Sequence, residues 1–225
     1  MGYDALNLGT PELHFGKEFL EQTRAPFPYI ASNLLYGGGR LPWMREYMIK
    51  EVGGIRVALL GVLDPDDLKN RDDLKGFEVM DPKAALDRLL PEVRGKADLV
   101  ILMGQLGEIK TMALVEAVPG IDVAIFAERN YAAKPPEKNA ILLETAERGA
   151  ELGLLTITLD DQRRLSVSER RDVPMDGSVP DNKEMLGLVE AHKREQRLKE
   201  NKEQMETLKM TPQEFMKRHR QEQTN

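Results

Sequence analysis

The fold follows from residues 47–63, which read Tyr47-Met-Ile-Lys-Glu-Val-Gly-Gly-Ile-Arg-Val-Ala-Leu-Leu-Gly-Val-Leu63. The Gly-Gly pair at 53 and 54 is a strong hairpin signal, so we expect two strands, Tyr47–Val52 and Ile55–Leu63. The second strand is a nearly continuous apolar run, which is typical of a strand covered on both faces. Leu99–Met103 has the same character. These two runs predict a buried, largely parallel central sheet.

Apolar runs and amphipathic segments alternate around this stretch. Asp81-Pro82 predicts a helix N-cap followed by Pro at the first helical position, and apolar residues at helical spacing continue to Val93. A second helix is expected over Ile109–Ala117. Strands that alternate with helices indicate an α/β domain. The other expected strands are Ala5–Leu8, Tyr29–Ser32, Val123–Phe126, Ile141–Glu144 and a closing antiparallel hairpin of Leu152–Leu159 with Leu165–Arg171.

The sequence changes character near Val173. We expect residues 1–172 to form the α/β domain, 173–180 a linker rich in Pro and Gly, and 181–225 a charged helical tail. The tail holds ten Lys or Arg and nine Asp or Glu, and its apolar positions are too sparse for a coiled-coil seam. Thr211-Pro212 predicts the start of a further helix. The tail is the expected contact surface for a protein partner.

Composition excludes several classes of protein. The 225 residues carry a net charge of −6 and no basic footprint, so we expect no nucleic acid polymer as a partner. No apolar run approaches the roughly 20 residues of a transmembrane segment, and no signal peptide is visible. Without cysteine there is no disulfide and no thiolate zinc site, and three histidines cannot build a His-rich metal centre. Because residue 1 already lies in a strand-like segment, we expect the chain to be truncated at its N-terminus.

Three features are expected to be structural. Gly37–Gly39 lacks the Lys-Ser/Thr that follows a phosphate-binding loop and predicts a flexible loop. The acidic residues at 64–67 and 72–73 lack EF-hand spacing and predict a solvated loop. Trp43 is expected in the core or at an interface.

Several segments, in order, resemble the 5′-nucleotidase branch of the calcineurin-like metallophosphoesterases. Gly9-Thr10-Pro11-Glu12-Leu13-His14-Phe15-Gly16 is similar to the Gly-Asn-His-Glu-Phe-Asp-Tyr-Gly turn of that family. The other similar segments are Pro28–Asn33, Met48–Gly61, Leu99–Gly107, Pro119–Asn130 and Leu142–Gly149 with the hairpin after it.

The resemblance implies an α/β fold: a metallophosphoesterase-like β-sandwich flanked by helices, incomplete at the N-terminus, followed by the charged helical tail. It also implies hydrolysis of phosphate esters with two divalent metals, which orient the phosphate and activate a water. A periplasmic or extracytoplasmic location is implied by the family, whereas the chain itself leaves the location unknown.

The positions that bind metal in this family carry other residues here. Pro11 stands at the position of the catalytic His, and His14 at that of the Asp that orients it. Thr10 replaces the metal-binding Asn, and Gln105 replaces the His of a Ser-His-Leu-Gly motif. Glu128 and Asn130 replace a His-x-His pair. The first two ligand motifs of the family would precede Met1.

Two interpretations remain for these substitutions. In one, Gln105, Glu128 and Asn130, with Thr10, hold a single hard cation. In the other, the pocket is a relic and these polar groups satisfy loop backbone. Thr10 is more simply a helix N-cap and His14 a packed or solvated histidine. For substrate binding, Arg129 could hold an anion and Tyr131 could stack on a base.

The leading hypothesis is a degenerate 5′-nucleotidase-like domain, catalytically impaired, with a binding or scaffold role and no cofactor. The alternative is an active metal-dependent phosphohydrolase acting on nucleotides or other phosphate esters. Its missing ligands would then come from upstream or from a partner chain, and Mn, Zn, Co, Mg or Ca would be its metal. A third hypothesis is an interaction module that works through the tail.

Overall fold

The structure is a computed structural model that describes residues 2–24, 27–127, 140–146, 149–160, 162 and 164–207, the side chains of 204–207 excepted. The chain divides into two compact units, Met1–Met175 and Asp176–Asn225, which are described separately. No helix within the described ranges is long and apolar enough to cross a membrane.

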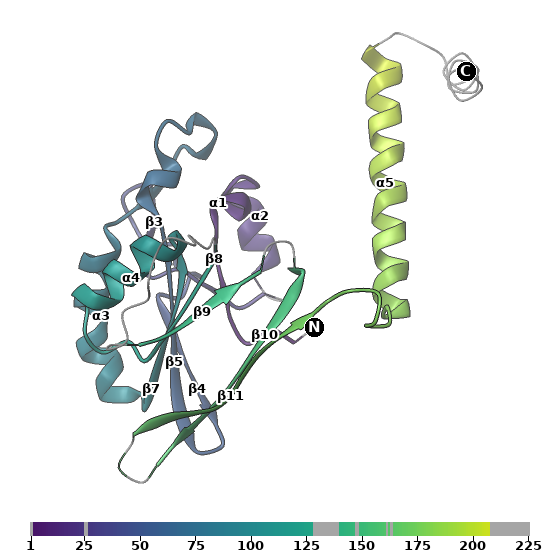
Figure 1. Ribbon diagram of the computed structural model, residues 1–225. Helices are drawn as coiled ribbons and strands as arrows, with labels where there is room; N and C mark the ends of the chain where they lie inside the picture. Colours follow the sequence, from purple (N-terminus) through teal and green to yellow (C-terminus); the bar gives the residue numbers. More distant parts are fainter. Residues whose placement is uncertain are drawn as a thin grey trace. The chain divides into compact units, whose positions relative to one another are not determined.

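A five-stranded sheet forms the centre of the first unit (Figure 1). Its first two strands are antiparallel and the remaining neighbours are parallel, which confirms the predicted α/β class with a largely parallel sheet. In spatial order the strands are β4 (Tyr47–Val52), β5 (Ile55–Leu63), β7 (Leu99–Gln105), β8 (Val123–Ala127) and β9 (Ile141–Thr145).

The predicted Gly-Gly hairpin is confirmed. Gly53 and Gly54 both have positive φ, 57° and 82°, as a two-residue turn between antiparallel strands requires. A side chain at either position would strain the turn, so this local signal determines the β4–β5 pairing.

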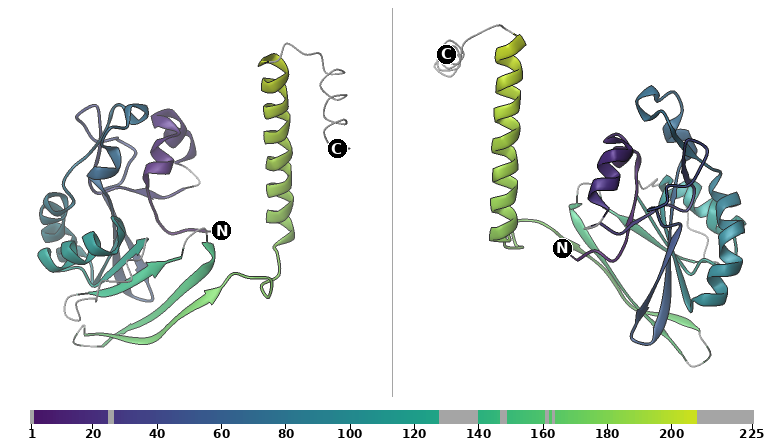
Figure 2. Two further views of the ribbon diagram at one scale, coloured as in Figure 1. Left: turned by 45° about the horizontal axis from the view of Figure 1, so that its top comes forward. Right: turned by 180° about the vertical axis from the view of Figure 1, so that it is seen from behind.

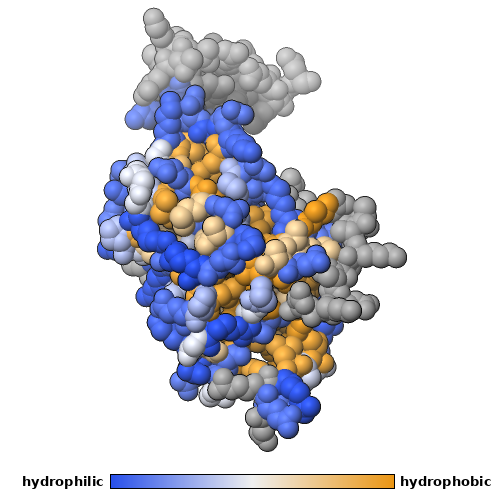
Figure 3. All heavy atoms as spheres, turned by 90° about the vertical axis from the view of Figure 1, so that its left-hand side faces the viewer, coloured by the Kyte–Doolittle hydropathy of each residue, from blue (hydrophilic) through white to orange (hydrophobic). Residues whose placement is uncertain are grey.

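Two helices, α3 (Pro82–Lys96) and α4 (Gly107–Ala117), cover one face of the sheet (Figure 1). Alternate residues of β5, namely Ala58, Leu60 and Val62, are fully buried against this helical layer. The N-cap of α3 is confirmed, because the Asp81 carboxylate accepts a 2.8 Å hydrogen bond from the backbone N–H of Ala84. Figure 3 shows the surface on the side of α3 and α4, which is mainly hydrophilic with apolar areas between.

The other face of β5 packs against the N-terminal segment of the chain. Here β1 (Leu6–Asn7) pairs in parallel with β2 (Tyr29–Ile30), and both contact β5. The helices α1 (Thr10–Leu13) and α2 (Gly16–Thr23) follow β1 and contribute Leu13 and Leu20 to a second apolar cluster. The central sheet therefore lies between two layers.

Two short strands were not predicted from the sequence. β3 (Leu34–Tyr36) and β6 (Phe77–Val79) pair antiparallel, and two 3₁₀ turns, η1 (Pro65–Leu68) and η2 (Asp72–Leu74), lie between β5 and β6. The loop expected at Gly37–Gly39 is confirmed as a short turn. Tyr36 and Gly39 exchange two backbone hydrogen bonds, which close a tight turn at the end of β3.

The predicted C-terminal hairpin is confirmed as β10 (Glu151–Leu159) and β11 (Leu165–Pro174) (Figure 2). A β-bulge between Thr156 and Ile157 shifts its register. In the second unit, α5 (Lys183–Thr207) runs for 25 residues, with Asn182 accepting hydrogen bonds from its first free N–H groups. The helix start predicted at Thr211 lies outside the described residues.

A pair of buried polar residues joins these layers. Asn33 is fully buried, and its amide donates to the carbonyl oxygens of Leu63 and Met80, both at 2.9 Å. Its carbonyl oxygen accepts from the N–H of Leu63 at 3.0 Å. The neighbouring hydroxyl of Ser32, also fully buried, donates to Glu46 and accepts from Gly61. Both the amide nitrogen and the carbonyl oxygen of the Asn33 side chain are thus bound to backbone groups.

We expect Asn33→Ala to lower the free energy of unfolding by about 3 kcal/mol, because it leaves three buried backbone groups without partners. Urea unfolding followed by circular dichroism measures this change. Gln22→Ala, at an exposed position of α2, is the control and should stay within about 0.5 kcal/mol of the parent. Equal effects of the two substitutions would contradict the role of Asn33.

Candidate functional site

Three chain segments meet at the carboxyl ends of the parallel strands. The turn at Gly9 follows β1, Asp64 follows β5, and Gln105 ends β7. A Cβ placed on Gly9 would lie 3.7 Å from Cδ of Gln105, so this side chain rests against the turn. The structure therefore brings Gln105 beside the Gly9–Pro11 turn. The remaining predicted site residues, Glu128, Arg129, Asn130 and Tyr131, lie outside the described residues.

The turn after β1 is capped differently from the prediction. Gly9 is the N-cap of α1, in an extended conformation, and Thr10 is the first helical residue. The Glu12 carboxylate reaches back and accepts the N–H of Gly9 at 2.8 Å, which supplies the capping bond. The assignment of Thr10 as N-cap is therefore wrong. Its hydroxyl is free to point elsewhere, and Pro11 occupies the second helical position, where its missing N–H costs nothing.

Asn7 fixes the base of this turn. Its amide donates to the carbonyl oxygens of Val62 and Met103, at 3.1 and 3.0 Å, and so ties β1 to both β5 and β7. The Asn7 oxygen fills the space beside Gly61, where an added Cβ would lie only 2.2 Å from it. This oxygen is buried and has no hydrogen-bond donor in the described part of the chain. Only glycine fits at position 61 while Asn7 keeps this orientation.

The solvated loop predicted at residues 64–67 and 72–73 is confirmed for Asp66, Asp67, Asp72 and Asp73, which are exposed, whereas Asp64 departs from it. Asp64 is buried, and its carboxylate receives the Lys110 ammonium at 2.5 Å. Lys110, on α4, also contacts Asp66 at 2.7 Å. Lys110 lowers the pKa of Asp66 to about 2, with help from Lys69. The two carboxylates in turn raise the pKa of Lys110. We call residues 64–73 the acidic loop.

The acidic loop also holds α1. The Thr10 hydroxyl donates to Asp67 at 3.3 Å, and His14 Nδ1 lies 2.9 Å from an Asp73 carboxylate oxygen. Arg71 forms two hydrogen bonds to the same Asp73 carboxylate and, with His14, lowers the pKa of that group. Two predicted site residues, Thr10 and His14, are therefore engaged with carboxylates of one loop. The His14 side chain is exposed, which confirms the solvated histidine of the prediction, and its Nδ1 lies within hydrogen-bond distance of Asp73.

Among the described residues, those around the turn do not supply the ligands of a pair of divalent cations. Gln105 offers one amide oxygen, and the Thr10 hydroxyl is a poor ligand that already donates to Asp67. The Glu12 carboxylate accepts the N–H of Gly9, and Asp64 and Asp66 share the ammonium group of Lys110. Within the described ranges, no group of three or more His, Asp or Glu side chains could hold a metal ion.

One charged residue near this edge was missed from sequence. Glu108 lies in the first turn of α4 and is only 7% exposed. It lines a cavity of about 460 Å³, together with Phe126 of β8, Glu144 of β9 and Arg170 of β11. An acidic residue in the first turn of a helix is an ordinary helix-start signal, which hid its burial from sequence reasoning.

Comparison with known proteins gives consistent results, although no family model matches the chain. The chain is 35% identical over 144 residues to the uncharacterized metallophosphoesterase YunD of Bacillus subtilis strain 168. It is 28% identical over 131 residues to a 5′-nucleotidase of Vibrio cholerae serotype O1. The matched regions are 62% and 56% of this chain but only 31% and 24% of those proteins, so the chain spans a third or less of either relative.

A solved structure shows the same fold. The calcineurin-like phosphoesterase YfkN of Bacillus subtilis superposes with a TM-score of 0.69 at 20% identity, over 88% of this chain and 71% of that one.

We expect Lys110→Gln to raise the pKa of Asp66 from about 2 toward its ordinary value near 3.9, because the strongest cation beside it is lost. Carboxyl carbon chemical shifts measured by NMR between pH 1 and 6 report this titration. Since the pKa is lowered in the folded state, the pairing stabilises the loop above about pH 4 and is lost as the pH falls toward 2. Lys50→Gln, beside Asp4 on β4, should leave the Asp66 titration unchanged. An Asp66 pKa near 2 in the Lys110 variant would refute the assignment.

Proposed function

Since the chain belongs to the 5′-nucleotidase branch of the calcineurin-like metallophosphoesterases, we propose that it is a catalytically impaired domain of that family with a binding or scaffold role. Family membership comes from the sequence relatives, and the fold is that of a calcineurin-like phosphoesterase. The impairment and the present role are our inference.

One observation carries the proposal: the acidic loop contacts Thr10 and His14, two residues of the turn that stand at site positions of the family. Thr10 donates to Asp67, and His14 pairs with Asp73. Both side chains are committed to a segment of the same chain, and Pro11 between them offers neither a donor nor an acceptor. The contacts are exposed and individually weak, so their effect is to hold the loop on α1 rather than to stabilise the whole domain.

The charge at this edge also favours a structural role. A two-metal phosphoesterase needs carboxylates and imidazoles that converge on cations. Here Lys110 supplies the positive charge instead, bound directly between Asp64 and Asp66. An ammonium group is a fixed counter-charge and cannot activate a water as a metal does. The charged groups at this edge therefore serve to position the acidic loop.

The second candidate is an active phosphohydrolase on nucleotides or other phosphate esters. The matched region is only 31% of the length of YunD, which favours this candidate because ligand residues of such relatives can lie outside the matched region. In that case upstream residues or a partner chain would contribute the missing ligands, and a divalent metal would polarise the phosphate and supply the attacking hydroxide. Gln105 would be the contribution of this chain from the described residues.

A partner contact through residues 181–225 is a third proposal. Near its start α5 exposes four apolar side chains, Met185, Leu186, Leu188 and Val189. An isolated helix gains little stability without apolar contacts, which favours a partner for this face. Deletion of residues 181–225 should then abolish capture of the partner without changing the circular dichroism of the body. Undiminished capture would contradict this role.

A phosphatase assay separates the first two candidates. With Mn²⁺ or Co²⁺ present, we expect no turnover of nucleoside monophosphates or p-nitrophenyl phosphate above that of a Glu128→Ala variant. Glu128→Ala is the matched control, because it removes a carboxylate at a family ligand position and exposes any contaminating phosphatase. Metal-dependent turnover that disappears in Glu128→Ala would overturn the proposal in favour of the active enzyme.

A further inference from the structure

A second cavity lies at the opposite end of the N-terminal strands. It has a volume of about 610 Å³, and we call it the aromatic basin. Tyr3 precedes β1 and Tyr29 begins β2, whereas Gly9 and the candidate site follow the carboxyl end of β1. The basin is thus separate from the phosphoesterase edge. The side chains that matter for its chemistry are Tyr3, Arg24, Phe27, Tyr29, Trp43 and Arg45.

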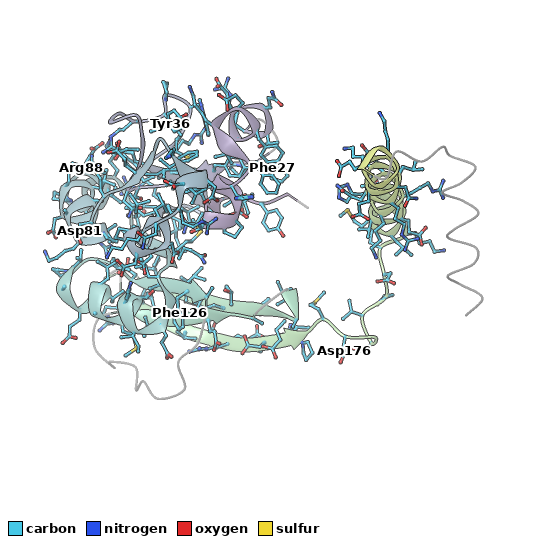
Figure 4. The ribbon with its side chains drawn as sticks, turned by 90° about the horizontal axis from the view of Figure 1, so that it is seen from above. Phe27, Tyr36, Asp81, Arg88, Phe126 and Asp176 are labelled. Carbon is cyan, nitrogen blue, oxygen red and sulfur yellow. The ribbon has the colours of Figure 1, made fainter. Side chains whose placement is uncertain are left out.

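Aromatic rings form the walls of the basin. Phe27 and Tyr29 stack, with ring centroids 5.8 Å apart and planes inclined by 27°. Phe27 is 39% exposed, and Figure 4 shows its ring at the outer edge of the body. The Tyr29 hydroxyl lies 3.2 Å from that of Thr23, at the end of α2, which fixes the orientation of the ring. A flat ring entering the basin would meet a preformed stacking surface.

The basin is also cationic. Arg24 and Arg45 line it, and among the described lining residues there is no carboxylate. Other arginines of this acidic chain pair with carboxylates, as Arg56 does with Asp98 and Arg94 with Asp122. Arg24 and Arg45, in contrast, form no ion pair with any carboxylate among the described residues. Two guanidinium groups that lack counter-charges provide donors suited to a carboxylate or phosphate.

Trp43 supplies a second sign of an unfilled site. Its indole N–H is buried and has no acceptor in the part of the chain that the structure describes. Buried donors are normally paired, so an orphaned one beside a cavity points to a missing acceptor.

We propose that the aromatic basin binds a small planar aromatic anion, a ring that bears a carboxylate or a phosphate group. The ring stacks against Phe27 and Tyr29, and the anionic group is held by Arg24 and Arg45. The volume falls within the range of roughly 300 to 1,000 Å³ that is typical of small-ligand sites. This site is independent of the proposed function, since no residue of the acidic loop takes part in it.

The chain itself provides the readout, because Trp43 is its only tryptophan. Benzoate and phenyl phosphate are titrated separately into the full chain while tryptophan emission is recorded. We expect a saturable change with at least one of them, with Kd on the order of 1 mM, as for a fragment-sized ligand. The two probes distinguish a carboxylate ligand from a phosphate ligand. Neutral benzamide and inorganic phosphate, which each lack one half of the chemistry, should bind at least tenfold more weakly.

Variants assign the effect to the basin. Arg24→Gln and Arg45→Gln should each weaken binding about tenfold, as expected for loss of one charged hydrogen-bond partner. Both side chains are exposed, so folding should be retained. Arg197→Gln makes the same charge change on α5 and should bind like the parent. No saturable change with either anion, equal binding of benzamide, or unchanged Kd in both basin variants would each overturn the proposal.

Discussion

The buried amide of Asn33 is the interaction on which the surrounding architecture depends. A primary amide enclosed by apolar residues must find partners for its donors and its acceptor. Asn33 finds them on Leu63, the last residue of β5, and on Met80, just beyond β6. One side chain thereby fixes where the core strand ends and where the next short strand returns. The acidic loop lies between Leu63 and Met80, so the hydrogen bonds of Asn33 fix the two chain positions that flank it.

The acidic loop shows how charged and polar side chains anchor a loop at one edge of a parallel sheet. Three of its carboxylates meet an ammonium group, a hydroxyl and an imidazole from elements on two sides of the edge. Each contact lies at the surface and contributes little alone. Together they determine which way the loop folds, because it is anchored on α4 by Lys110 and on α1 by Thr10 and His14. Charge here specifies geometry more than it adds stability.

Most of the elements that could be predicted from the sequence have local signals. Apolar runs in β5 and β7, the Gly53-Gly54 turn and the Asp81 cap each involve neighbours within a few residues, and each was predicted. The β3–β6 pair joins strands of three residues across more than 40 positions and leaves no periodic pattern. The burial of Asp64 depends on Lys110, a residue 46 positions away. The partners of Thr10 and His14 lie more than 50 positions away and emerged only in three dimensions.

The fit between Asn7 and Gly61 links two strands that are remote in sequence. Because the amide oxygen of Asn7 occupies the volume that a methyl group at position 61 would need, Gly61 cannot be replaced while Asn7 keeps its place. Alanine at 61 becomes acceptable only alongside a smaller residue at 7, and that change would forfeit the bonds to Val62 and Met103. Homologous chains should therefore keep glycine at position 61 wherever they keep asparagine at position 7.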